Sequence, residues 1–166
     1  MNNNHGIEVA RLEAVNNTLK YGNYKEQMGR LKKAMTNHFL LEAICIEYNI
    51  IEDRTESILR HAGVYDPEKH NTLAKKIRRI KEIARGQRFL LRRYITEETM
   101  EEIRLWSKKR NPCIHDLLNQ SLSTQELEQI ATDGQTFAKL LCSKVTSYKK
   151  ALERERQNNP NGGIIR

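Results

Sequence analysis

Glycine and proline are scarce in this chain, which has 8 glycines and 3 prolines among 166 residues. No window shows the strict alternation of apolar and polar residues that a half-buried strand needs. Helix-forming Glu, Lys, Arg, Leu and Ala residues are plentiful instead. The sequence therefore disfavours a β-rich fold and predicts an all-α protein.

Long apolar runs are also absent. No run approaches the roughly 20 residues that a membrane-spanning helix needs, and residues 1–6 lack the basic and then apolar profile of a signal peptide. We therefore expect no membrane partner and a cytoplasmic location.

Cysteine is limited to Cys45, Cys113 and Cys142, which lie far apart and form no CxxC pair. Their odd number and spacing argue against both a disulfide framework and a zinc knuckle. Glu47 is not part of a Glu-x-x-His pair, so a di-iron bundle site is not indicated either. We expect no metal and no cofactor, and we interpret Cys113 as a packing residue because it has no basic partner of its own.

The formal net charge of +8 and the pI near 9.5 would favour a polyanionic partner, although many soluble proteins carry a similar charge. Basic residues crowd the segment from Lys75 to Arg93, which would suit an RNA backbone, an acidic protein such as an antitoxin, or only a solvated helix face. These alternatives stay open. The candidate RNA contacts are Lys75, Lys76, Arg78, Arg79, Arg85, Arg88, Lys108 and Lys109.

The length favours one domain. We expect a flexible N-terminus at residues 1–6, a single helical domain at 7–156 and a flexible tail at 157–166. Apolar residues at helical spacing predict helices over 7–19 and 24–35 and a central helix over 36–62, with Gly63 as its stop. The expected fold is an antiparallel bundle of about four main helices with one or two short ones.

Cap residues set the expected bounds of the later helices. The helix after the central one begins at Asp66-Pro67 or at Asn71. Thr96 caps a helix that ends near Arg110, and the capping box at Ser123–Glu126 opens a long final helix.

The segment Lys108–Leu117 carries the candidate chemistry. Asn111 is a favourable N-cap and Pro112 a favourable first helical residue, so we expect a new helix to start there. Arg110 then precedes the cap and His115 is the fourth helical residue, and these two positions pack together in a hydrophobic staple.

A helix N-terminus next to Arg110 would bind a phosphate, and its dipole would keep His115 neutral. Neutral imidazole can take the proton of an RNA 2′-hydroxyl as that oxygen attacks the adjacent phosphorus, while Arg110 stabilises the transition state. This cleavage would leave a 2′,3′-cyclic phosphate and a 5′-hydroxyl, would need no metal, and would spare DNA. Since the segment supplies one histidine, a dimer would provide both the base and the acid.

The run Arg110-Asn111-Pro112-Cys113-Ile114-His115 resembles the R-x(4–6)-H signature of HEPN domains, including the polar residue after the arginine. This resemblance implies a HEPN-like helical bundle, a homodimer with a composite cleft, and metal-independent ribonuclease activity. Many HEPN proteins act in toxin–antitoxin, abortive-infection or other defence systems. Carried over, Arg110 and His115 would be catalytic, and Asn111 would orient the histidine or the phosphate.

Two other interpretations remain. A catalytically inactive HEPN-like dimer would bind nucleic acid, a nucleotide or a partner protein, and a helical adaptor would carry the motif by accident. In the central helix, acidic Glu47, Glu52 and Asp53 lie among apolar turns, where a carboxylate would pair with Arg54 or reach Arg110. We expect a structural salt bridge.

Overall fold

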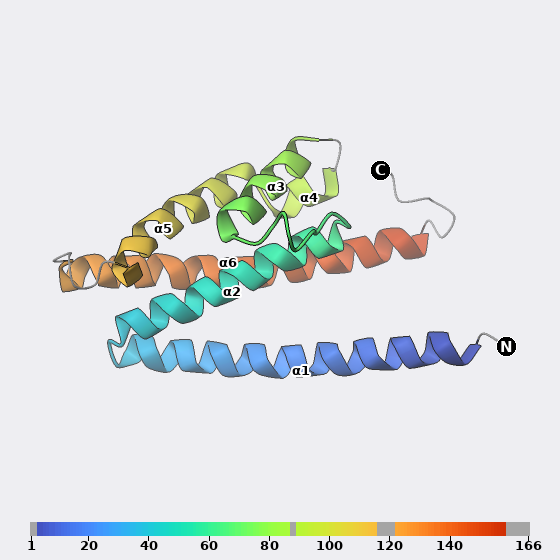
Figure 1. The fold of residues 1–166 in the computed structure, drawn as a ribbon, viewed down its shortest axis with the longest axis horizontal. Helices are drawn as coiled ribbons and strands as arrows, with labels where there is room; N and C mark the ends of the chain where they lie inside the picture. The colour runs from blue at the N-terminus through green and yellow to red at the C-terminus, as the bar shows by residue number, and fades with distance from the viewer. Residues whose placement is uncertain (1–2, 87–88, 116–121, 159–166) are drawn as a thin grey trace.

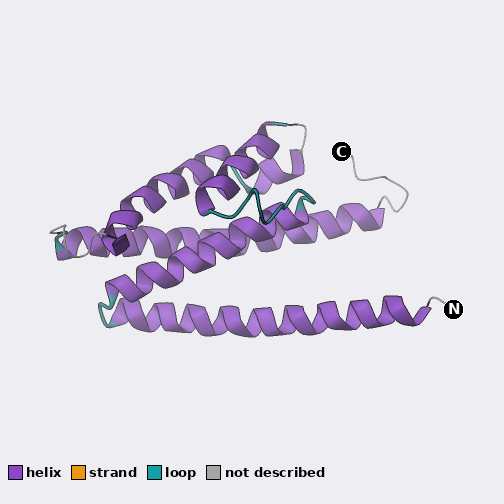
Figure 2. Cartoon of the chain, viewed as in Figure 1, coloured by secondary structure: helices purple, strands orange, loops and turns teal. Residues whose placement is uncertain are grey.

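Six α-helices and no strand make up the part of the chain that this computed structural model describes, which is residues 3–86, 89–115 and 122–158 (Figure 1). Side chains are described for residues 20–86, 90–114 and 122–158. Figure 2 shows helices joined by loops, which confirms the predicted all-α bundle. The helices are α1 (Asn3–Thr36), α2 (Leu40–His61), α3 (Leu73–Arg85), α4 (Phe89–Tyr94), α5 (Glu97–His115) and α6 (Thr124–Asn158).

The predicted central helix is α2, which contacts α1, α3, α5 and α6. In Figure 1, α1 lies on one side of α2, and α3 and α5 lie on the other. Burial of its apolar side chains on several faces explains why this segment is the most apolar of the chain. Its fully buried side chains include Ala43, Ile44, Ile51, Ile58 and Leu59.

The two helices predicted over 7–19 and 24–35 are one continuous helix, α1. Gly22 lies inside it, where an added Cβ would meet nothing within 4 Å. A glycine in an exposed helix costs only about 1 kcal/mol relative to alanine, so it does not by itself end a helix. The prediction of two separate helices was therefore wrong.

Gly63 ends α2 as predicted. It has a φ of 69° and follows the C-cap Ala62, and its backbone N–H donates to the Arg60 carbonyl at 3.0 Å. The next helix begins later than either predicted start, because Thr72 is the N-cap of α3 and its hydroxyl accepts from the Lys75 N–H at 3.3 Å. Asp66 caps only a short turn.

The caps predicted for α5 and α6 are present. The Thr96 hydroxyl accepts from the Thr99 N–H at 3.2 Å. Ser123 and Glu126 form the reciprocal capping box: the Ser123 hydroxyl accepts from the Glu126 N–H at 3.2 Å, and the Glu126 carboxylate accepts from the Ser123 N–H at 2.8 Å. Local hydrogen bonds of this kind fix helix starts wherever the residues that form them occur.

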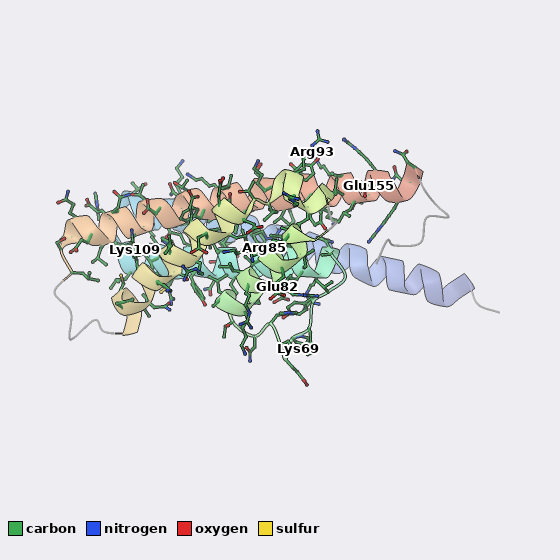
Figure 3. All side chains as sticks on the ribbon, turned by 90° about the horizontal axis from the view of Figure 1, so that it is seen from above. Lys69, Glu82, Arg85, Arg93, Lys109 and Glu155 are labelled. Carbon is green, nitrogen blue, oxygen red and sulfur yellow. The ribbon has the colours of Figure 1, made fainter. Side chains whose placement is uncertain are left out.

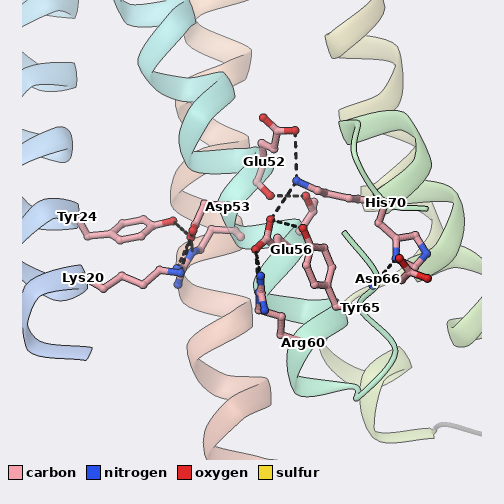
Figure 4. A network of polar contacts seen from close by, with 12 residues as sticks. Lys20, Tyr24, Glu52, Asp53, Glu56, Arg60, Tyr65, Asp66 and His70 are labelled. Atoms are coloured by element: carbon pink, nitrogen blue, oxygen red, sulfur yellow. Dashed lines mark hydrogen bonds and ion pairs between the residues drawn. The ribbon is translucent and has the colours of Figure 1, made fainter. Parts of the chain in front are cut away.

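A polar network fastens α1 to α2 (Figure 4). The Asp53 carboxylate accepts from the Tyr24 hydroxyl at 2.7 Å and pairs with Lys20 at 2.8 Å and Arg54 at 2.5 Å. Burial acts to raise the pKa of Asp53, but these hydrogen bonds outweigh it and lower the pKa to about 2. The salt bridge expected for Arg54 is therefore present, and Asp53 is its acidic partner.

No helix in the described ranges combines the length and the apolarity that crossing a membrane requires. The flexible ends predicted at residues 1–6 and 157–166 stay a prediction. Helix α1 includes residues 3–6 and α6 includes 157–158, while residues 1–2 and 159–166 lie outside the described residues.

Candidate functional site

Helix α5 is continuous from Glu97 to His115 and has Pro112 inside it. The helix start predicted at Asn111 is therefore wrong, as is the staple arrangement built on it. Pro112 lacks the N–H that would bond to the Lys108 carbonyl, but the helix continues because Cys113, one position later, is fully buried against the rest of the bundle.

Arg110 lies on the inward face of α5. Ile103, Trp106 and Cys113 on the same helix are buried, and position 110 falls between the last two at helical spacing. This placement explains why the Nε group of Arg110 is buried and has no hydrogen-bond partner among the described residues. Arg110 is thus held partly inside the bundle rather than projecting from a helix end.

Tyr48 of α2 fixes the guanidinium of Arg110. The guanidinium carbon lies 4.1 Å from the centre of the Tyr48 ring, a favourable cation–π contact. One Nη group donates weakly to the Asn111 side-chain oxygen at 3.4 Å. Burial raises the pKa of the Tyr48 hydroxyl. Arg110 and Asn111 are therefore brought together, with the arginine anchored by an aromatic ring.

His115 is the last residue of α5, and its side chain lies outside the described residues. Five helical positions separate it from Arg110, which places the two positions about 140° apart around the axis. Asn111 and position 115 are four apart and share a face. The argument that a helix N-terminus keeps His115 neutral is wrong, because this is the C-terminal end of a helix, where the dipole favours positive charge.

Glu47 neighbours Tyr48 on α2 and is fully buried. Both carboxylate oxygens lack a hydrogen-bond partner among the described residues. They lie against Gly134 of α6 and Trp106 of α5, where a glycine leaves the space that the carboxyl occupies. Burial raises the pKa of Glu47 to about 8. Glu47 therefore makes no salt bridge with Arg54 or Arg110 and is a neutral acid at pH 7.

The thiol of Cys113 donates to the Lys109 carbonyl at 3.2 Å. Burial raises its pKa, which disfavours the thiolate that a nucleophile requires. Both observations agree with a packing role for Cys113.

The candidate RNA contacts differ in accessibility. Lys76 is only 5% exposed and pairs with Glu52 and Glu56 of α2, at 3.3 Å each, so its place in the candidate set was wrong. Arg79 pairs with Glu82 at 3.1 Å and Arg85 with Glu97 at 2.9 Å. Lys75, Arg78, Lys108 and Lys109 are exposed, and Arg88 lies outside the described residues.

A groove of about 560 Å³ runs between α3 and α5. Lys75, Arg78 and Arg85 of the candidate set line it, together with Lys81 and Arg104, which the set did not include. Figure 3 looks onto this side of the bundle and labels Glu82 and Arg85 on α3 and Lys109 near the end of α5. Arg104 belongs to this surface because α5 packs against α3, and that contact could not be predicted from the sequence.

Among the described residues, no group of three or more His, Cys, Asp or Glu side chains is arranged to hold a metal ion. No family model, no curated protein and no solved structure matches this chain.

Proposed function

We propose that this protein is a metal-independent endoribonuclease of the HEPN type that acts as a homodimer. The observation that carries the proposal is the anchoring of Arg110. Its guanidinium is stacked on Tyr48 and adjoins Asn111, on the helix whose last residue is His115. An arginine held in one orientation beside a polar side chain is suited to stabilising charge on a phosphate.

Arg110 binds the scissile phosphate through its Nη groups, since its Nε group is buried. His115 accepts the proton of the 2′-hydroxyl while that oxygen forms its bond to phosphorus. The bond from phosphorus to the 5′ oxygen breaks, and this oxygen takes a proton from an imidazolium. The products are a 2′,3′-cyclic phosphate and a 5′-hydroxyl.

Dimerisation supplies the second histidine. One chain offers a single His115 for two proton transfers, and a twofold axis near the ends of two α5 helices provides one histidine as base and the other as acid. The same axis brings the Arg110 of one subunit near the His115 of the other, which matters because positions 110 and 115 lie on different faces of one helix.

The test is incubation of the protein with mixed-sequence RNA and matching DNA in EDTA, followed by analysis of product ends. RNA, and not DNA, is cut to cyclic phosphate ends by the wild type, and Arg110→Ala and His115→Ala abolish cleavage. Arg60→Ala is the matched control, because Arg60 is also stacked on a tyrosine, at 4.2 Å from the Tyr65 ring. Loss of activity in that control would show that the assay reports stability rather than catalysis.

A dimeric scaffold that binds nucleic acid without cutting it is the second candidate. The observation that favours it is the separation of about 140° between positions 110 and 115 on one continuous helix. RNA binding without cleavage in the assay above identifies this alternative.

A further inference from the structure

The groove between α3 and α5 has more positive than negative charge. Five cationic side chains line it against two carboxylates, Glu82 and Glu101, and a third carboxylate, Glu97, pairs with Arg85 at 2.9 Å. Ile77 and Ala74 also contribute to its lining, so its surface is partly apolar between the charged groups. The cations are Lys75, Arg78, Lys81, Arg85 and Arg104.

Glu101 links the two helices that form the groove. Its carboxylate accepts from Lys81 of α3 at 2.8 Å and from the Arg104 Nε at 2.9 Å, so one acid holds two cations from opposite walls. Arg78 is exposed and has no ion pair among the described residues. The groove therefore has surplus positive charge that an anionic ligand would neutralise.

The cations are spaced along the helices rather than gathered at one point. Lys75, Arg78 and Arg85 lie on one side of α3 and span about 15 Å along its axis. On α5, Arg104, Lys108 and Asn111 are spaced i, i+4 and i+7, and position 115 is i+11, so all four fall within about 60° around the axis. The cations Arg104 and Lys108 therefore share a face of α5 with Asn111 and position 115, and this face leads from the groove to the end of the helix.

We propose that this groove binds the sugar-phosphate backbone of single-stranded RNA and leads it to the end of α5. An extended row of cations complements a polymer with regularly repeated charges, and guanidinium groups suit phosphate oxygens. Single-stranded RNA is favoured over an acidic protein because the same face of α5 continues to Asn111 and position 115, two of the residues of the proposed ribonuclease site. The inference rests on the proposed function, since it identifies how the substrate of that site is held.

The test measures binding of a fluorescent 2′-O-methyl RNA 15-mer, which has no free 2′-hydroxyl and cannot be cleaved by this route. Arg78→Ala and Arg104→Ala each lower the slope of log affinity against log salt by about 0.7, the value for one phosphate contact to a single strand. If a variant and the wild type bind equally at 1 M salt, this change in slope makes the variant bind roughly eightfold more weakly than the wild type at 50 mM salt. Arg78→Lys keeps the charge and most of the slope.

Lys33→Ala is the matched control, because it removes an exposed cation from α1, across α2 from the groove (Figure 1). The proposal is overturned if the control and the groove variants change the slope equally, if the wild type does not bind at 50 mM salt, or if poly-glutamate binds more tightly than RNA. The last result would identify an acidic protein as the ligand.

Failure of the two proposals is distinguishable. Groove-dependent binding of the uncleavable RNA without cleavage of ordinary RNA refutes the enzyme and keeps the groove. Cleavage of ordinary RNA with unchanged binding by Arg78→Ala and Arg104→Ala refutes the groove and keeps the enzyme.

Discussion

Replacing Glu47 by glutamine should make the protein more stable at neutral and alkaline pH. The Glu47 carboxyl is buried, has no hydrogen-bond partner among the described residues, and lies against Gly134 and Trp106. In this site the carboxyl stays neutral in the folded protein, whereas in the unfolded chain it ionises near its ordinary pKa. Glutamine keeps the size and the neutral charge, so Glu47→Gln removes only the cost of keeping the proton.

The size of the effect follows from the pKa. Burial raises the pKa of Glu47 from 4.5 to about 8, and each tenfold change in an acid dissociation constant corresponds to about 1.4 kcal/mol. Between pH 4.5 and 8 the folded state binds the extra proton, so the free energy of unfolding falls as pH rises, by about 5 kcal/mol in total. The free energy of unfolding of Glu47→Gln should therefore equal that of the wild type below pH 4.5 and exceed it by about 3 kcal/mol at pH 7. Above pH 8 the difference should reach its full value of about 5 kcal/mol.

Urea unfolding of both proteins at each pH unit from 4 to 9 measures this difference, and contributions from all other groups cancel in the comparison. Glu102→Gln is the control, because it makes the same substitution at an exposed position of α5. A constant difference between Glu47→Gln and the wild type across this range would refute the reasoning, since it would mean that Glu47 ionises normally in the folded protein.

Three further substitutions test the packing and the polar network. Gly134→Ala places a Cβ 2.7 Å from the Trp106 ring and against the Glu47 carboxylate, so urea unfolding should show a loss of about 1–3 kcal/mol. Trp106→Phe removes the 2.9 Å hydrogen bond to the buried Ile130 carbonyl, and the same measurement should show a loss of about 1–3 kcal/mol. Asp53→Asn removes stability that is present above pH 3.8 and lost as pH falls toward 2, so acid titration followed by circular dichroism should show a flatter profile below pH 4. Stabilities equal to that of the wild type, or an unchanged acid profile, would contradict these expectations.

Features determined by neighbouring residues could be predicted from the sequence. Thr96, the Ser123–Glu126 capping box and Gly63 each act through hydrogen bonds or backbone conformation within a few residues. The apolar spacing of residues 36–62 likewise identified α2 as the central helix. Local patterns of this kind are visible in one sequence because the interacting groups are close along the chain.

Features that depend on distant residues could not be predicted. Asn111 and Pro112 form a good local start signal, but burial of Cys113 continues α5 through them. Lys76 joins the core only because Glu52 and Glu56 of another helix lie opposite it. Its position three residues after the buried Leu73 was the available signal, although the sequence does not show which acids neutralise it.

The burial of Glu47 is the clearest case of this kind. Its environment depends on Gly134, 87 positions later in the sequence. The stacking of Arg110 on Tyr48 also joins two separate helices, so the motif at 110–115 does not show how Arg110 is held.

The most direct test of the central claim is end analysis of RNA incubated with the wild-type protein in EDTA. We expect fragments with 2′,3′-cyclic phosphate and 5′-hydroxyl ends from the wild type, and no such fragments with Arg110→Ala. Intact RNA at protein concentrations that saturate binding, or cleavage that Arg110→Ala leaves unchanged, would contradict it.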